Sequence, residues 1–332
     1  MANFIRNILQ KLFSSSSPPE LTKFKNNSSS CLPISSNILS SSTTIAAATT
    51  KKHVQLGFPK PILYYLKKNA KPKLLLKLMK SSKLHFSFKE FPFFATHFLK
   101  TDKAKWIYFD QGTDEIKALD LENLSKPLWI TNGIDCSSRE KTTIVSNLLS
   151  KTFICDIKYF RIVGRVLSMK QLKTLNSKNS IEYFTLYNSH VECCEGRIVK
   201  MDEIIRCLPN VKTFLWLFSR TMVSMITPYA TRKLIDSLNP SILTSFHLMN
   251  VPETFDFKLF AKFMKKHPWI EYYLEFDNIS LKFSKMLQSF VDKLVKKAAA
   301  KKYRPIRIRF PGQTFQSQVL LEDFYQSYSR LI

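Results

Sequence analysis

The chain has 332 residues, 45% of them hydrophobic, which is enough for a small module and one larger domain with its own core. Its 51 Lys and Arg residues outnumber the 25 Asp and Glu residues. The resulting net charge of +26 points to an acidic partner: a nucleic acid, an anionic membrane or an acidic protein. Lysines interrupt the apolar runs, so the sequence offers no stretch of about 18–20 residues that could cross a bilayer.

The cysteines do not have the pattern of a disulfide framework. There are six of them, with one adjacent pair: Cys31, Cys136, Cys155, Cys193, Cys194 and Cys207. Their number and spacing favour free thiols in a reducing compartment. A cluster of His190 with Cys193, Cys194 and Cys207 lacks the paired CxxC or HxxxH spacing that presents ligands to one ion, so we expect no metal site.

Residues 1–57 form a basic, serine-rich leader whose only acidic residue is Glu20. Its start places apolar residues at helical spacing, namely Phe4, Ile5, Ile8, Leu9 and Leu12. This start resembles a mitochondrial presequence, whereas the composition of the whole leader is typical of a disordered tail. We favour the disordered leader and keep mitochondrial targeting as the alternative.

Residues 58–105 hold a helical module with twelve basic and two acidic residues. Pro61 fits the first turn of one helix, and Pro72 opens a second helix after a break. The first helix places Ile62, Leu63 and Leu66 on one side. The second has a broad apolar face that includes Leu74, Leu75, Leu78 and Met79, with lysines opposite.

Residues 106–332 contain short apolar segments with the recurring pattern apolar-x-x-apolar-x-apolar. Four segments match it, at 157–162, 181–186, 211–216 and 243–248. A fifth segment, at 271–276, has Glu271 at the first apolar position. The steps between first positions are 24, 30, 32 and 28 residues. This spacing indicates a repeated structural unit.

Helical patterns alternate with these segments, at 138–153, 166–175, 201–208, 231–238, 255–266 and 282–302. A strand–helix unit of about 20–30 residues cannot bury its apolar face alone, so such units stack on one another. We therefore expect an α/β fold in which 106–332 form a curved solenoid with a parallel sheet. An ordinary α/β domain with similarly spaced strands is the alternative, and the aligned first, fourth and sixth positions favour the solenoid.

The sequence lacks the signatures of common catalytic sites. It contains no GxGxxG or GxxxxGK phosphate loop, no GxSxG elbow and no HExxH motif. One acidic cluster has no base or nucleophile beside it and is better explained as a solvated loop. It comprises Asp110, Asp114, Glu115, Asp120 and Glu122. We therefore expect that the protein is not an enzyme and that it needs no cofactor.

A second basic segment lies at 282–309, with ten Lys and Arg residues against one acidic residue. Its apolar stripe consists of Leu287, Phe290, Val291, Leu294 and Val295. We expect this stripe to pack on neighbouring strands with the lysines in solvent. A basic helix that lies on a membrane or on phosphates is the alternative. Nucleic-acid binding is thus a second hypothesis, based mainly on net charge.

The stretch 58–86 resembles an F-box. That family has Leu-Pro, two residues, Ile-Leu and a helix, then a Pro-containing turn, a leucine-rich helix and an aromatic ending. The corresponding residues here are Phe58-Pro59, Ile62-Leu63, Leu66, Pro72-Lys73, Leu75, Leu78, Ser82-Lys83 and His85-Phe86. An F-box followed by leucine-rich-repeat-like units resembles the divergent F-box families of nematodes.

This resemblance implies a substrate-recognition adaptor of an SCF-type ubiquitin ligase. In such proteins the F-box docks on the acidic adaptor Skp1, which bridges to cullin, and the repeat domain binds a substrate protein. The resemblance assigns the contact with a Skp1-type adaptor to Phe58, Pro59, Ile62, Leu63, Leu66, Leu75 and Leu78. It implies a location in the cytoplasm or nucleus, and it does not identify the substrate.

Overall fold

The computed structural model describes residues 59–69, 93–102, 105–109, 116–137, 143–298 and 306–329. The chain divides into two units, Met1–Leu56 and Gly57–Ile332, and every described residue belongs to the second unit. The predictions for the leader, including the mitochondrial alternative, therefore lie outside the described residues. So does the second helix expected between Pro72 and Phe86.

Most of the described residues form one mixed α/β domain around an eleven-stranded sheet. The strands are β1 (Phe94–Asp102), β2 (Lys105–Phe109), β3 (Ile116–Leu119), β4 (Leu128–Cys136), β5 (Thr152–Cys155), β6 (Tyr159–Val163), β7 (Val166–Ser168), β8 (Tyr183–Tyr187), β9 (His190–Glu192), β10 (Thr213–Leu217), β11 (Ser245–Val251), β12 (Glu271–Phe276) and β13 (Ile306–Arg309). Their order is β13-β12-β11-β10-β8-β6-β4-β1-β2-β3, with β5 also paired to β4 and a separate pair of β7 with β9. The sheet is parallel except for the antiparallel pairs β1–β2 and β2–β3. The predicted α/β class with a mostly parallel sheet is thus confirmed.

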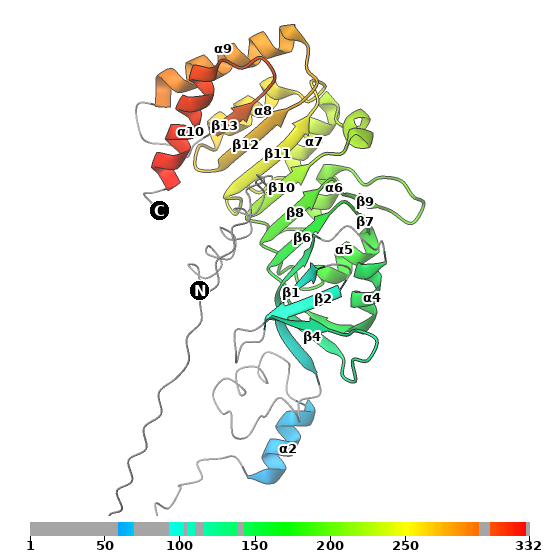
Figure 1. Cartoon of the computed structure of the whole chain (residues 1–332). Helices are drawn as coiled ribbons and strands as arrows, with labels where there is room; N and C mark the ends of the chain where they lie inside the picture. Colours follow the sequence, from blue (N-terminus) through cyan, green and yellow to red (C-terminus); the bar gives the residue numbers. More distant parts are fainter. Residues whose placement is uncertain are drawn as a thin grey trace, which may run out of the picture. The chain divides into compact units, whose positions relative to one another are not determined.

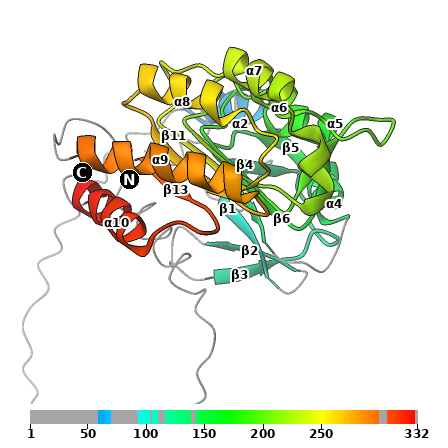
Figure 2. The ribbon, with the colours of Figure 1, turned by 90° about the horizontal axis from the view of Figure 1, so that it is seen from above.

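The helices are α2 (Lys60–Asn69), α4 (Ile144–Lys151), α5 (Met169–Leu175), α6 (Met201–Arg206), α7 (Pro228–Ser237), α8 (Phe257–Lys266), α9 (Leu281–Ala298) and α10 (Phe315–Ser329), with one 3-10 helix, η2 (Arg220–Met225). Helices α4 to α8 cover the same face of the sheet (Figures 1 and 2). Links between adjacent parallel strands cross over with the same hand, so successive helices fall on one side. We call this side the helical face.

The repeated segments of the sequence become neighbouring strands. Their fourth positions align across the sheet as Phe160, Phe184, Phe214 and Phe246, all fully buried. The rings stack with centroids 5.6–5.9 Å apart. The same residue type at the same register in each unit therefore forms a continuous aromatic row beneath the helices.

The alignment expected for the last segment was wrong by two residues. The structure pairs Ser245 with Glu271 and Phe246 with Tyr272, so Glu271 does not occupy the first apolar position. Tyr272 continues the aromatic row on β12, and its side chain is fully buried. Burial of this side chain on the helical face fixes the register, because a one-residue slip would turn Tyr272 to the other face.

Side chains cap the N-termini of α5, α7 and α8, and the segment predicted as a helix at 166–175 starts with a strand. Ser168 and Gln171 form a capping box at α5, so the pattern at 166–175 divides into β7 and a shorter helix. Thr227 caps α7, which starts at Pro228, and Asp256 caps α8 by accepting the N–H of Leu259.

The first strands of the sheet were not anticipated. Strand β1 lies inside the range 58–105 that the sequence assigned to the helical module, and it pairs in parallel with β4. The sheet therefore begins at Phe94. Gly133 on β4 allows the close approach of β1, since a Cβ at this position would lie 2.5 Å from the Phe98 ring.

Residues with a positive φ, in the left-handed backbone region, recur where the chain leaves a strand. Gly164 follows β6, Asn188 follows β8 and Asn278 lies just beyond β12, each with φ between 48° and 63°. Glycine and asparagine adopt this conformation at the lowest cost among L-residues. The same local bend therefore directs the chain out of the sheet in several units.

The buried thiols yield a first prediction. Burial raises the pKa of Cys136, and it raises that of Cys155 to about 12. Since the thiolate is the reactive form, we expect neither residue to react with N-ethylmaleimide in the folded protein at neutral pH. Exposed Cys194 should react under the same conditions. Peptide mass spectrometry before and after urea unfolding checks this, and labelling of Cys136 without urea would contradict the burial.

Candidate functional site

Helix α2 exposes apolar side chains. Ile62 is 46% exposed, Tyr64 68% and Tyr65 65%, and Leu66 is half-buried. Ile62 and Leu66 stand four residues apart and therefore lie on the same side of the helix. Pro59 is exposed just before the first turn. The helix thus offers an apolar stripe together with two exposed aromatic rings.

The structure places three of the seven predicted adaptor contacts: Pro59, Ile62 and Leu66. Leu63 lies within α2, but its side chain is outside the described residues. Phe58, Leu75 and Leu78 also lie outside them. The predicted contact between the two helices of the module therefore stays a prediction.

A row of mostly polar side chains crosses the sheet on the face opposite to the helical face. Successive strands pair its members in register: Lys100, Asp135, Arg161, Thr185, Leu215, His247, Tyr273 and Arg307. These residues alternate with the buried aromatic and aliphatic rows, as strand geometry requires. We call this line the polar row.

The C-terminal end of the polar row is a dense charged and aromatic cluster around Arg307. The Arg307 guanidinium carbon lies 3.5 Å from the ring centroid of Tyr325 and 4.9 Å from that of Tyr273. Its nitrogens lie 3.7 Å from the Glu322 carboxylate and 3.9 Å from that of Glu271. Aromatic faces and two carboxylates thus hold this cation in one orientation.

His247 connects the cluster to the next strand. Its Nε2 lies 2.8 Å from the Ser245 hydroxyl and 3.3 Å from Glu271 Oε1. Its ring meets Tyr273 edge-on at 5.8 Å. The Tyr273 hydroxyl donates to Glu275 at 2.6 Å, and burial together with this carboxylate raises the pKa of Tyr273.

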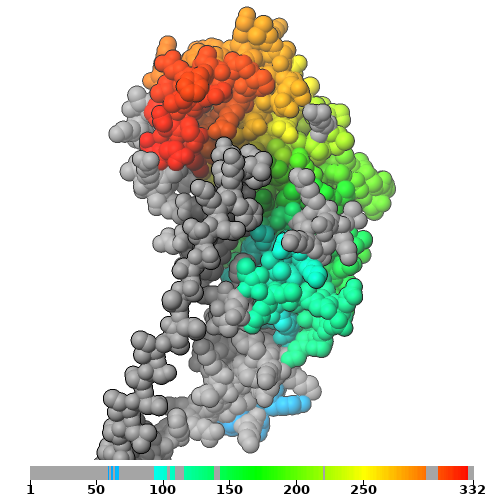
Figure 3. Space-filling model, in the orientation of Figure 1, coloured from blue at the N-terminus to red at the C-terminus, as the bar shows by residue number. Residues whose placement is uncertain are grey.

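Helix α10 belongs to this face of the sheet. Ile308 points into the core, so its neighbours Arg307 and Arg309 point the opposite way. Both arginines reach Glu322 of α10, at 3.7 and 3.5 Å. Figure 2 accordingly shows α10 on the other side of the sheet from α8, and Figure 3 shows it beside α9 at the surface.

Asp135 is the carboxylate of the polar row, and its side chain is fully buried. Its Oδ2 lies 3.8 Å from Arg161 Nη1, and Lys100 is its partner on β1. Burial raises the pKa of this carboxyl, while Arg161, Ser137 and Lys100 oppose the rise. The polar row thus contains a desolvated charge held against two cations.

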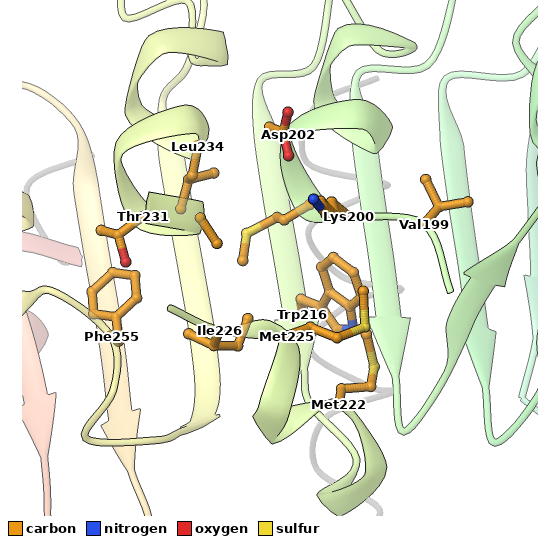
Figure 4. Close-up of a pocket in the computed structure, with 12 residues that line it drawn as sticks. Val199, Lys200, Asp202, Trp216, Met222, Met225, Ile226, Thr231, Leu234 and Phe255 are labelled. Carbon is orange, nitrogen blue, oxygen red and sulfur yellow. The ribbon is translucent and has the colours of Figure 1, made fainter. Parts of the chain in front are cut away.

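The helical face contains a groove between α6, η2 and α7. It has a volume of about 370 Å³, with Lys200, Arg206, Tyr229 and Lys233 in its lining. A small apolar hollow adjoins it, between residues such as Trp216, Met222, Leu234 and Phe255 (Figure 4). The acids of the groove are engaged, Asp202 by Arg206 and Glu203 by Arg197 at 3.2 Å. Both carboxylates in the groove lining therefore form ion pairs with arginines.

Several other polar groups singled out in the sequence have structural partners among the described residues. His190 Nε2 lies 2.8 Å from Glu192, and the Cys207 sulfur faces that of Met169 at 3.9 Å. In the described parts of the chain, no three His, Cys, Asp or Glu side chains gather as a metal site. Asp120 accepts N–H bonds from Glu122 and Asn123 in a turn, and the Asn123 amide lowers its pKa most.

The polar row was missed at the sequence level, although a signal for it exists. Arg161, Thr185, Leu215 and His247 all occupy the fifth position of the repeated segment, between its two aligned apolar positions. Alternation along a strand turns the fifth position away from the fourth and sixth. The mostly polar residues at the fifth position of successive repeats therefore mark the face of the sheet that carries the polar row.

Comparison with protein-family models, with curated proteins and with solved structures gives no match to this chain. None of the described helices combines the length and the apolar character that a membrane span needs. The assignment of function therefore rests on the residues and geometry described above.

Proposed function

We propose that the protein is a substrate-recognition adaptor of an SCF-type ubiquitin ligase, with an F-box-like module at 58–86. The module docks on an acidic Skp1-type adaptor, which connects the protein to cullin. A leucine-rich-repeat-like solenoid binds the substrate protein. This role needs no catalytic group in the chain itself.

The order of the strands supports the solenoid. From β6 to β13 the chain adds each new strand of the main sheet beside the last, in parallel, and places a helix between most of them. Units in such an array contact only their neighbours and bury a continuous core between them. Phe160, Phe184, Phe214 and Phe246 form this core at one repeated position.

The apolar surface of α2 carries the proposal. Ile62, Tyr64 and Tyr65 are exposed together on one short helix. Full burial of one large apolar side chain contributes about 1.5–3 kcal/mol to binding. Association costs about 4–15 kcal/mol, so several of these side chains must be buried at once to offset it. A helix that lays an apolar stripe into a partner's groove gains this burial.

The polar row supports a binding role for the repeat domain. Its half-buried members, among them Arg161, Thr185 and His247, line one side of the sheet. Arg307 is already held in place by Tyr273 and Tyr325. Side chains on a rigid sheet lose little freedom on binding, which favours specific recognition of another protein. The substrate itself is left open.

The test of docking is capture of a purified Skp1-type adaptor by the full chain. We expect the wild type to bind and the double variant Ile62→Asp with Leu66→Asp to bind at least about a hundredfold more weakly, because each of these apolar side chains contributes about 1.5–3 kcal/mol when buried. Binding isotherms measured by calorimetry give the ratio. Failure of the wild type to bind would reject the adaptor assignment.

The matched control is the double variant Phe315→Asp with Val319→Asp, which places the same two charges at exposed apolar positions four residues apart on α10. It should bind the adaptor like the wild type. Equal weakening by the control and by the α2 variant would mean that added charge, and not the α2 surface, caused the loss of affinity.

The proposed role places the protein in the cytoplasm or nucleus. A reporter fused to residues 1–57 that enters mitochondria would contradict this location.

A further inference from the structure

Three neighbouring helices at the C-terminal end of the helical face carry an excess of positive charge. Their exposed basic residues are Arg232 and Lys233 on α7, Lys258, Lys262, Lys265 and Lys266 on α8, and Lys282, Lys285, Lys293 and Lys296 on α9. The exposed acids on these helices are Asp236 and Asp292, so ten charges minus two leave +8. We call this surface the basic helical surface.

The lysines of α8 and α9 form two stripes that point away from the sheet. On α8 they stand at intervals of three and four residues, opposite Phe260 and Phe263, which are buried. On α9 the lysines lie opposite Leu287 and Val291, which are fully buried. The expected packing of the α9 apolar stripe is thus confirmed, and each helix directs its charges outward.

These cations are not used by the fold. None of the ten forms an ion pair with any residue that the structure describes. Lys233 makes a cation–π contact, with its Nζ 5.6 Å from the centroid of the Tyr229 ring. By contrast, Lys158 and Lys212 both pair with Glu182 in an earlier part of the repeat domain. Unpaired like charges on adjacent helices repel one another, and a polyanion would relieve this repulsion.

We propose that the basic helical surface binds double-stranded nucleic acid through its phosphate backbone, without reading sequence. Seven residues of helix span about 10 Å and packed helices lie about 8–10 Å apart, so the charges form a grid of roughly that spacing. Duplex grooves about 6–12 Å wide separate phosphate rows by similar distances. Lysines, which make up nine of the ten residues, act as point charges for phosphates and not as bidentate readers of bases.

The same surface fits other polyanions less well. A membrane-bound helix inserts apolar residues beside its charges, but the exposed large apolar residues of α7 to α9 within the described residues are Tyr229 and Leu281, each in a first turn. Single strands need exposed aromatic rings between the cations, and the α8 stripe has none. Protein interfaces are depleted in lysine and centre on apolar anchors.

The binding test compares the full chain with the triple variant Lys258→Gln, Lys262→Gln and Lys265→Gln. Fluorescence anisotropy with two duplexes of unrelated sequence, each of about 30 base pairs, is measured over a series of salt concentrations. We expect equal affinity for both duplexes, and a slope of log K against log salt that becomes shallower by about 2.7 in the variant, which is about 0.9 for each lysine that no longer neutralises a phosphate. Binding at low salt should weaken by about one to two orders of magnitude.

The matched control replaces three exposed lysines around α5, as Lys170→Gln, Lys173→Gln and Lys178→Gln. It removes the same charge from the chain, and we expect it to keep the wild-type slope. An equal change in both triple variants would assign binding to net charge alone and overturn the proposal. A strong preference for one duplex would overturn it as well.

Vesicles of phosphatidylcholine and phosphatidylserine in equal parts form the last arm of the test. Binding to these vesicles without binding to either duplex would assign the surface to a membrane and overturn the proposal. The outcome does not depend on adaptor docking, because the triple variant leaves α2 unchanged and should still bind a Skp1-type adaptor. The two proposals therefore fail or succeed separately.

Discussion

Phe214→Ala is expected to lower the free energy of unfolding by about 3–5 kcal/mol. Phe214 is fully buried on β10, and its ring stacks on Phe184 at 5.9 Å and on Phe246 at 5.6 Å between centroids. Truncation removes this apolar burial and leaves a cavity between two neighbouring units. Since each unit is stabilised by its neighbours, damage at β10 weakens the array on both sides.

Urea unfolding followed by far-UV circular dichroism measures the effect. Phe214→Leu should cost less, because leucine refills part of the cavity. Phe315→Ala, at an exposed position, should change stability by no more than about 0.5 kcal/mol. If Phe214→Ala cost no more than Phe315→Ala, the aromatic row would not be the core of the domain.

The stability of the protein is expected to fall as the pH rises through the titration of Asp135. Burial raises the pKa of this carboxyl above its unfolded value, so the folded state binds its proton more tightly. The contribution is fully present below the unfolded pKa of about 3.9 and is lost as the pH rises through the folded pKa. Within that window one proton gives a slope of up to about 1.4 kcal/mol per pH unit.

Asp135→Asn removes this titration while it nearly preserves the shape of the side chain. The difference in unfolding free energy between the wild type and the variant, measured by urea unfolding at several pH values, isolates one group from all others. We expect the difference to shift in favour of the variant as the pH rises, because an amide stays neutral and never becomes a desolvated charge. A pH-independent difference would show that the carboxylate is well solvated or fully compensated by Arg161 and Lys100.

Periodicity in the sequence predicted several elements from residue 157 onward, although it did not predict β7, β9 or α10. The segment at 211–216 becomes β10 (Thr213–Leu217), and the pattern at 255–266 becomes α8 (Phe257–Lys266). These elements are encoded within a few residues, because burial on one side repeats every second or every three to four positions. The exact register of β12 was missed, since it depends on the position of Tyr272 beside Phe246 on another strand.

The candidate sites were predictable to different degrees. The apolar stripe of Ile62 and Leu66 was evident from helical spacing alone, and the exposure of Ile62 agrees with a docking role that stays a prediction. The cluster around Arg307 was not evident, because its members come from β11, β12, β13 and α10. A long-range cluster of this kind has no local pattern to reveal it.

The sequence by itself determined that the chain is strongly basic, that it alternates strands with helices, and that α2 carries an apolar stripe. Only the tertiary structure decided that β1 to β3 extend the sheet, that Asp135 is buried against Arg161, and that lysines of three helices form one surface. The physical reason is that side-chain periodicity depends on near neighbours along the chain. Burial and charge density depend instead on which distant segments the sheet brings together.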